Sequence, residues 1–115
     1  MRALVVGLLV LAAATPAWTA EVRCEIDAKF ACGLSGCRES AVTVWNLIDI
    51  DALRFSRCDR KGCDHYAMSQ TVSGAFTNIE VPGRGMIAKV SLDGSQYVEV
   101  VTLGTDVLIS YGSCQ

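Results

Sequence analysis

Hydrophobic and polar residues alternate with a period of two along most of the chain beyond residue 40. The stretch 86–92 (M-I-A-K-V-S-L) is the clearest case, with apolar side chains at the even positions and Lys89 and Ser91 at odd ones. This period is typical of a β-strand with one buried face. The segments 41–51, 96–103 and 107–111 are also rich in β-branched and aromatic residues, which favour strands.

Turn-forming residues separate these runs at short intervals, at Ser73-Gly74, Pro82 to Gly85, Asp93-Gly94 and Gly104 to Asp106. Between them the sequence predicts strands at 41–51, 53–57, 66–72, 75–81, 86–92, 96–103 and 107–111. Residues 21–40 are interpreted as a loop-rich segment with one short strand at 26–31. About six or seven strands, without a run of helical period, predict an all-β fold. The expected architecture is a small antiparallel up-and-down meander, braced by disulfides, that closes into a barrel or a curled sheet.

The first 20 residues have the layout of a secretory signal peptide. Arg2 gives a basic start, residues 3–14 form a short apolar core, and small residues follow. Cleavage is expected between residues 14 and 20, and the apolar run is too short to span a membrane. Residues 21–115 are then expected to form a single β domain that is secreted or periplasmic.

Six cysteines lie beyond the expected signal peptide. An even number in a small exported domain indicates three disulfides and an oxidising compartment. Two pairs share a C-x4-C spacing, so the simplest pairing joins Cys32 to Cys37 and Cys58 to Cys63, and leaves Cys24 to join Cys114. The sequence does not fix this connectivity. A structural zinc module is the alternative, since two successive C-x4-C pairs approach zinc-ribbon spacing. Oxidation after export argues against it, and neither a metal nor another cofactor is expected.

Enzymatic chemistry has little support in this sequence. The chain contains a single histidine, His65, which follows Asp64. No nucleophile-elbow, metalloprotease or paired-carboxylate motif accompanies it, and no C-x-x-C redox motif is present. We therefore expect a protein that is not an enzyme.

The best candidates for binding are basic residues at turns. Arg57, Arg60 and Lys61 lie at or beside the Cys58–Cys63 turn, with His65 directly after it, and Arg84 lies in the Pro82–Gly85 turn. A turn closed by a disulfide presents its charges with little loss of entropy on binding. These residues predict a small exported binding or interaction protein whose partner is a protein or an anionic ligand, in the cell envelope or outside the cell. The whole chain carries a formal net charge of −2, which does not support nucleic-acid binding.

A second binding hypothesis places a small apolar ligand inside the barrel. The cleft would be lined by aromatic residues, namely Trp45, Phe55, Tyr66 and Phe76. The alternative is that these side chains fill the core, because a domain of this size has little volume to spare.

The Ser73-Gly74-Ala75-Phe76 segment, in a small exported β protein with cysteines, resembles the exported bacterial inhibitors of c-type lysozyme. Members of that family carry a Ser-Gly-x-x-Tyr segment followed by a Trp/Lys/Gly segment. Here Phe76 is the nearest aromatic residue, and Lys89 lacks the tryptophan and glycine neighbours. The resemblance implies an inhibitor of a secreted or host hydrolase, with Ser73 and Lys89 as the residues carried over.

Overall fold

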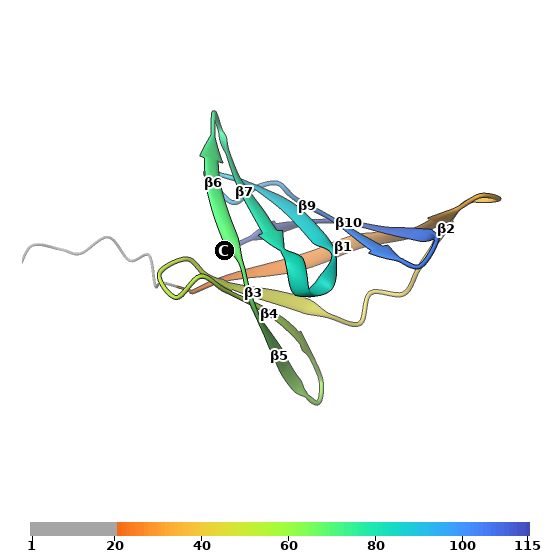
Figure 1. Ribbon diagram of the computed structural model, residues 1–115, viewed down its shortest axis with the longest axis horizontal. Coiled ribbons are helices and arrows are strands. Elements are labelled where there is room, and N and C mark those ends of the chain that lie inside the picture. Colours follow the sequence, from red (N-terminus) through yellow and green to blue (C-terminus); the bar gives the residue numbers. More distant parts are fainter. Residues whose placement is uncertain (1–20) are drawn as a thin grey trace, which may run out of the picture.

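The computed structural model describes residues 21–115, and the expected signal peptide lies outside them. This part of the chain forms one antiparallel sheet of ten strands that curls into a nearly closed barrel (Figure 1). The strands are β1 (Glu21–Gly33), β2 (Gly36–Glu39), β3 (Trp45–Asp49), β4 (Arg54–Asp59), β5 (Gly62–Ala67), β6 (Ser69–Ser73), β7 (Phe76–Val81), β8 (Met86–Ser91), β9 (Tyr97–Leu103) and β10 (Asp106–Cys114). A short 3-10 helix, η1 (Pro82–Arg84), joins β7 to β8. Among the described residues no helix has the length and apolar character needed to cross a membrane.

The strand order is β5-β4-β3-β1-β10-β9-β8-β7-β6, with β2 paired to the second half of β1. Hairpins connect most neighbouring strands, and the pairing of β1 with β10 joins the two ends of the described chain. The edge strands β5 and β6 follow each other in the chain through Met68, whose backbone N–H donates to the carbonyl of Leu53 at 3.0 Å. The β4–β5 and β6–β7 hairpins splay apart in Figure 1. The predicted antiparallel meander and its closure toward a barrel are thus confirmed.

Residues 21–40 differ most from the sequence prediction. In place of a loop-rich segment with one short strand at 26–31, β1 is 13 residues long and β2 folds back on it. The register of β1 against β10 shifts between Ile26 and Ala28, so the side chains change face midway and the period of two is broken. Gly112 lies opposite this bulge, where a Cβ atom would sit 1.8 Å from the carbonyl oxygen of Glu25. Only glycine fits at that position.

Two other predicted strands have different limits. The segment 41–51 contributes only β3, and the return strand expected at 66–72 is divided into β5 and β6 at Met68, whose side chain is buried. At this division the chain passes from β5, at one edge of the sheet, to β6, at the other edge. The remaining predicted strands are present with small shifts of their ends, and β10 extends to Cys114.

The core lies inside the curl of the sheet. Its most deeply buried side chains include Ile48, Phe55, Ile79, Val81 and Met86. Each of the three disulfides joins residues directly opposite each other on neighbouring strands, which confirms the simplest pairing: Cys24–Cys114, Cys32–Cys37 and Cys58–Cys63. Because every cysteine is oxidised, no thiolate remains for the zinc module considered above.

Candidate functional site

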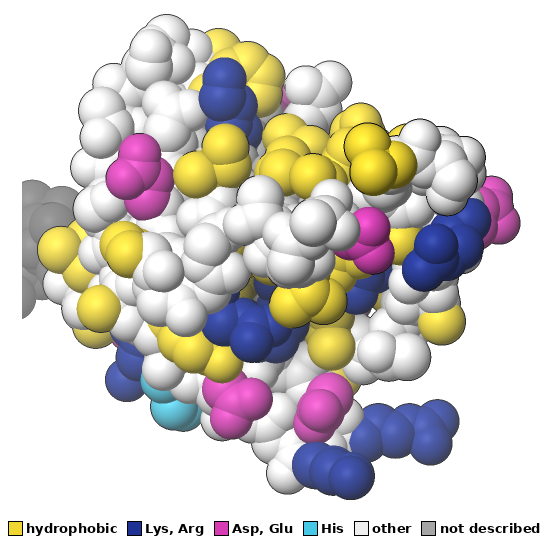
Figure 2. Space-filling model, turned by 45° about the vertical axis from the view of Figure 1, so that its right-hand side comes forward, with side chains coloured by type: hydrophobic (Ala, Val, Ile, Leu, Met, Phe, Trp, Pro, Cys, Tyr) yellow, Lys and Arg dark blue, Asp and Glu magenta, His cyan; other side chains and the backbone are white. Residues whose placement is uncertain are grey.

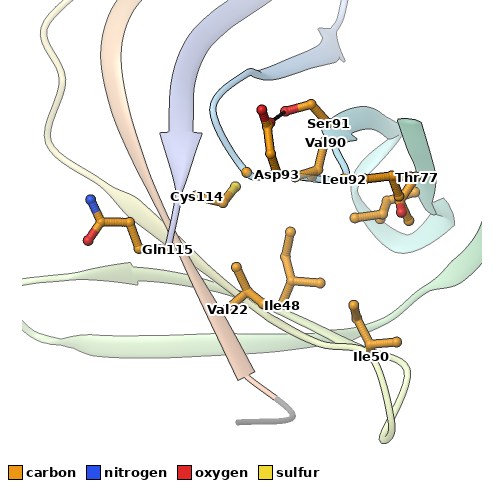
Figure 3. A pocket seen from close by; sticks show the side chains of 12 residues that line it. Val22, Ile48, Ile50, Thr77, Val90, Ser91, Leu92, Asp93, Cys114 and Gln115 are labelled. Carbon is orange, nitrogen blue, oxygen red and sulfur yellow. Dashed lines mark hydrogen bonds between the residues drawn. The ribbon is translucent and has the colours of Figure 1, made fainter. Parts of the chain in front are cut away.

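One end of the barrel, which we call the terminal end, carries Glu21, Gln115, the β3–β4 turn (50–53) and the β8–β9 turn (92–96). An apolar pocket of about 320 Å³ opens there, between β1 and β3 on one side and β7 and β8 on the other (Figure 3). Figure 3 shows side chains from both sides directed toward the space between them. The pocket is therefore an opening of the barrel core to solvent.

Aliphatic side chains make up most of the pocket wall. Ile48 and Ile79 are each 2 % exposed and belong to the core, whereas Ile50 and Leu92 are 39 % and 54 % exposed. Val22 lies directly opposite Ile48 on the neighbouring strand, so both face the interior. The pocket thus runs from buried core residues to exposed ones, which is the form expected of a site for an apolar ligand.

The β8–β9 turn supplies part of the polar wall, beside Thr77, Ser91 and Gln115, and is fixed by a network around Asp93. The hydroxyls of Ser91 and Ser95 each donate to Asp93 Oδ1 at 2.7 Å, and the Ser95 backbone N–H donates to it at 3.0 Å. These hydrogen bonds, the backbone bond from Ser95 first, lower the pKa of Asp93 from 3.8 to about 2. Asp93 is the only charged side chain among the residues that line the pocket.

Gly94 anchors the same turn to the end of β10. Its carbonyl accepts from the backbone N–H of Cys114 at 2.7 Å, and its φ of 76° lies in the left-handed region that favours glycine. A Cβ atom at this position would lie 2.4 Å from the Cys114 carbonyl oxygen. The turn is therefore held against the disulfide-linked strand, and the pocket wall is preformed.

A second set of residues, the interior polar cluster, crosses the barrel from β3 and β4 to β9. It consists of Asn46, Arg57, Tyr97 and Glu99. Arg57 donates to both carboxylate oxygens of Glu99, from Nη1 at 3.1 Å and from Nη2 at 2.7 Å, and Glu99 is 1 % exposed. Asn46 Nδ2 donates to the Tyr97 hydroxyl at 2.9 Å. Burial, and then the nearby Glu99 carboxylate, raise the pKa of Tyr97 well above its usual value.

The structure separates the basic residues that the sequence grouped together. Arg57 is not displayed at the Cys58–Cys63 turn, because the alternation of β4 directs it into the barrel, where its side chain is 14 % exposed. Arg60 and Lys61 are exposed in the turn itself, which the Lys61 backbone N–H closes by donating to Asp59 Oδ1 at 2.8 Å. Basic side chains project at the lower edge of Figure 2, where the β4–β5 hairpin ends. A binding role for Arg60 and Lys61 stays a prediction.

Arg84 and His65 occupy different places again. Arg84 stacks over the ring of Tyr66, with its Cζ 5.6 Å from the ring centroid. His65 is exposed on β5, and its Nδ1 lies 2.6 Å from the hydroxyl of Ser56 on β4. Ser56 is 2 % exposed, so its hydroxyl is shielded from a substrate. This geometry is better explained as a hydrogen bond that links β4 to β5 than as a catalytic pair of a serine nucleophile and its histidine base.

The predicted aromatic cleft is not formed. Phe55 is fully buried in the core, and Tyr66 faces the same side of the sheet. By strand alternation, Trp45 and Phe76 lie on the opposite face of the sheet, and the guanidinium of Arg23 covers Trp45 at 4.8 Å. The pocket is aliphatic instead.

Ser73 and Lys89, the two residues that the resemblance to lysozyme inhibitors implies for binding, are both exposed. Ser73 ends β6 and Lys89 lies in the middle of β8, with β7 between the two strands. Ser73 is paired with Phe76, and Lys89 with Asn78, two residues further along β7.

Sequence reasoning missed the interior polar cluster and the aliphatic pocket. A signal for the first was present, since Glu99 shares its strand parity with Tyr97 and Val101 and therefore faces the core. The pocket had no such signal, because its walls come from strands that only the curl of the sheet brings together. No protein-family model, curated protein or solved structure matches this chain.

Proposed function

We propose that this chain is a small exported binding protein without enzymatic activity, and that its ligand is a small, uncharged, apolar molecule held in the pocket at the terminal end. The observation that carries the proposal is the pocket of about 320 Å³ with aliphatic walls that is continuous with the core. This volume lies at the lower limit of the about 300–1,000 Å³ common for small-molecule sites. Three disulfides fit a protein of the extracellular space or the periplasm.

The charge of the pocket narrows the class of ligand. Asp93 has the only charged side chain among the residues that line the pocket, and its low pKa keeps it anionic at neutral pH. An anionic head group, such as the carboxylate of a fatty acid, would meet repulsion there without a basic partner. A neutral ligand avoids this repulsion and gains from leaving water.

The preformed wall supports binding without a large conformational change. The β8–β9 turn is fixed by the hydrogen bonds of Asp93 and Gly94, and β1 is joined to β10 by the Cys24–Cys114 disulfide. A ligand that enters therefore orders few groups, which lowers the entropic cost of binding.

Fluorescence titration with the neutral probe N-phenyl-1-naphthylamine tests the proposal. We expect saturable binding to the wild-type protein and at least a tenfold loss of affinity in Leu92→Glu, because the new carboxylate stands at the pocket and opposes an apolar ligand. Leu103→Glu is the matched control, since Leu103 is 64 % exposed in β9 and does not line the pocket.

Two outcomes would contradict the proposal. Equal binding by Leu92→Glu and Leu103→Glu would place the probe elsewhere. Loss of binding in Ile87→Glu, a 58 % exposed position on the outer side of β8, would move the site to the outer face of the sheet.

A further inference from the structure

The end of the barrel opposite the pocket, which we call the η1 end, holds a smaller recess of a different chemical kind. Its volume is about 120 Å³, and it lies among β1, β4, β9, β10 and η1. Three basic side chains line it, Lys29, Arg57 and Arg84, together with one carboxylate, that of Glu99. The recess shares no lining residue with the apolar pocket.

The basic residues come from three directions because of the barrel topology. Lys29 lies directly opposite Ser110 on β10, and both face the interior. Arg57 enters from β4 on the other wall, and Arg84 comes from η1, which packs against β5 through Tyr66. Figure 2, which brings this end of the molecule forward, shows Lys and Arg side chains in the middle of the face between hydrophobic ones.

The charges of the recess are unbalanced. Glu99 is fully engaged by the two Nη atoms of Arg57, so it is not free to neutralise Lys29 or Arg84. Among the described residues, neither Lys29 nor Arg84 forms an ion pair, and Arg84 lies over the ring of Tyr66. Arg57 Nε is also buried without an acceptor. The recess therefore has a net charge of two positive units and an unused donor, with Lys29 half-buried and Arg84 exposed.

We propose that the recess at the η1 end binds a small oxyanion, a phosphate, sulfate or carboxylate group, between Lys29 and Arg84. The hydroxyl of Ser110, a residue that is 2 % exposed and lines the recess, is placed to donate to the same anion. The recess is too small for a drug-sized ligand, for which about 300 Å³ is the usual minimum, but it suits a single anionic group. Because the charge of Arg57 is already paired with Glu99, the anion is held mainly by the two cations that lack a carboxylate partner.

Titration of the ¹⁵N-labelled protein with inorganic phosphate, followed by amide chemical shifts, tests this site. Chemical shifts are preferable to melting temperatures, because phosphate stabilises most proteins through its exclusion from their surface. At constant ionic strength we expect saturable shifts near Lys29, Arg84 and Ser110, and none with chloride. A second titration with acetate shows whether the site also accepts a carboxylate. Saturable phosphate binding supports the proposal whether or not acetate binds.

Matched variants separate the site from general electrostatic attraction. Lys29→Gln and Arg84→Gln are each expected to weaken phosphate binding at least tenfold. Arg60→Gln and Lys61→Gln remove the same charge from the exposed β4–β5 turn and are expected to leave binding unchanged. The dispersion of the amide spectrum shows that each variant is folded. Equal weakening by all four variants, or no saturable shift in the wild-type protein, would overturn the proposal.

Discussion

At the scale of single residues, the ion pair between Arg57 and Glu99 is the most consequential side-chain contact found. It joins β4 to β9, strands that are not neighbours in the sheet, so it connects opposite walls of the barrel. A buried ion pair of this kind adds little to the stability of the fold when it is compared with a well-packed apolar pair of the same shape. Its effect appears when one partner is lost, because the other is then left as an uncompensated buried charge.

We therefore expect Arg57→Ala to lower the free energy of unfolding by about 3–5 kcal/mol. Arg54→Ala is the control: Arg54 lies on the same strand, is 45 % exposed and approaches Asp49 Oδ2 at 3.7 Å, and its loss should cost less than about 1 kcal/mol. Urea denaturation of both variants measures the difference. Similar losses for the two would show that Glu99 finds another partner or takes up a proton.

At the scale of elements, the hydrogen bonds that Asp93 accepts in the β8–β9 turn are expected to make one wall of the apolar pocket sensitive to pH. The folded-state pKa of this carboxyl, about 2, lies below its ordinary value of 3.8. The negative charge therefore stabilises the turn fully at pH values above the ordinary pKa of 3.8. This contribution disappears as the pH falls toward the folded-state pKa of about 2. Acid is expected to loosen one wall of the pocket.

The variant Asp93→Asn tests this coupling. We expect it to be less stable than the wild-type protein at pH 6, and the difference in unfolding free energy to shrink as the pH falls through about 4 toward 2. Urea denaturation at a series of pH values measures both proteins. Asp106→Asn, at the exposed start of β10, serves as the control. A difference that stays constant with pH would mean that the charge of Asp93 does not fix the turn.

Strand prediction succeeded where the period of two was unbroken and failed where the backbone departs from it. β8 and β9 follow their predicted ranges closely, because each alternates between one buried and one exposed face. β1 was missed over most of its length because a bulge after Ile26 changes the parity of its side chains. Its length depends on pairing with β3, β10 and β2, which no local pattern reveals.

At the scale of the whole molecule, the disulfide between Cys24 and Cys114 joins strands whose linked residues are 90 positions apart. The loop-entropy model gives about 4.6 kcal/mol for a ring of this length, and about 2 kcal/mol for each of the short rings at Cys32–Cys37 and Cys58–Cys63. The long disulfide also links β1 to β10, the central pairing that joins the strands β5-β4-β3-β1 to the strands β10-β9-β8-β7-β6.

Replacement of Cys24 and Cys114 together by alanine should therefore lower the free energy of unfolding by about 4–5 kcal/mol, against about 2 kcal/mol for the pair Cys58 and Cys63. Denaturation by guanidinium chloride under non-reducing conditions compares the two double variants. An equal loss for both would indicate that strain in the native state, and not the length of the ring, sets the contribution.

The sequence by itself determined the antiparallel all-β class and most strands beyond residue 40, and it indicated the simplest pairing of the cysteines without fixing it. Alternation, turn residues and cysteine spacing are local, and each can be read from a few neighbouring positions. The candidate sites depended on tertiary structure. Arg57 and Arg60 are three residues apart in the chain, but the alternation and curl of the sheet direct one into the barrel and leave the other exposed. The same curl brings Ile48 and Ile79 to opposite walls of one pocket, and Lys29 to the recess with Arg84, because the curl of a sheet sets distances between strands that are remote in sequence.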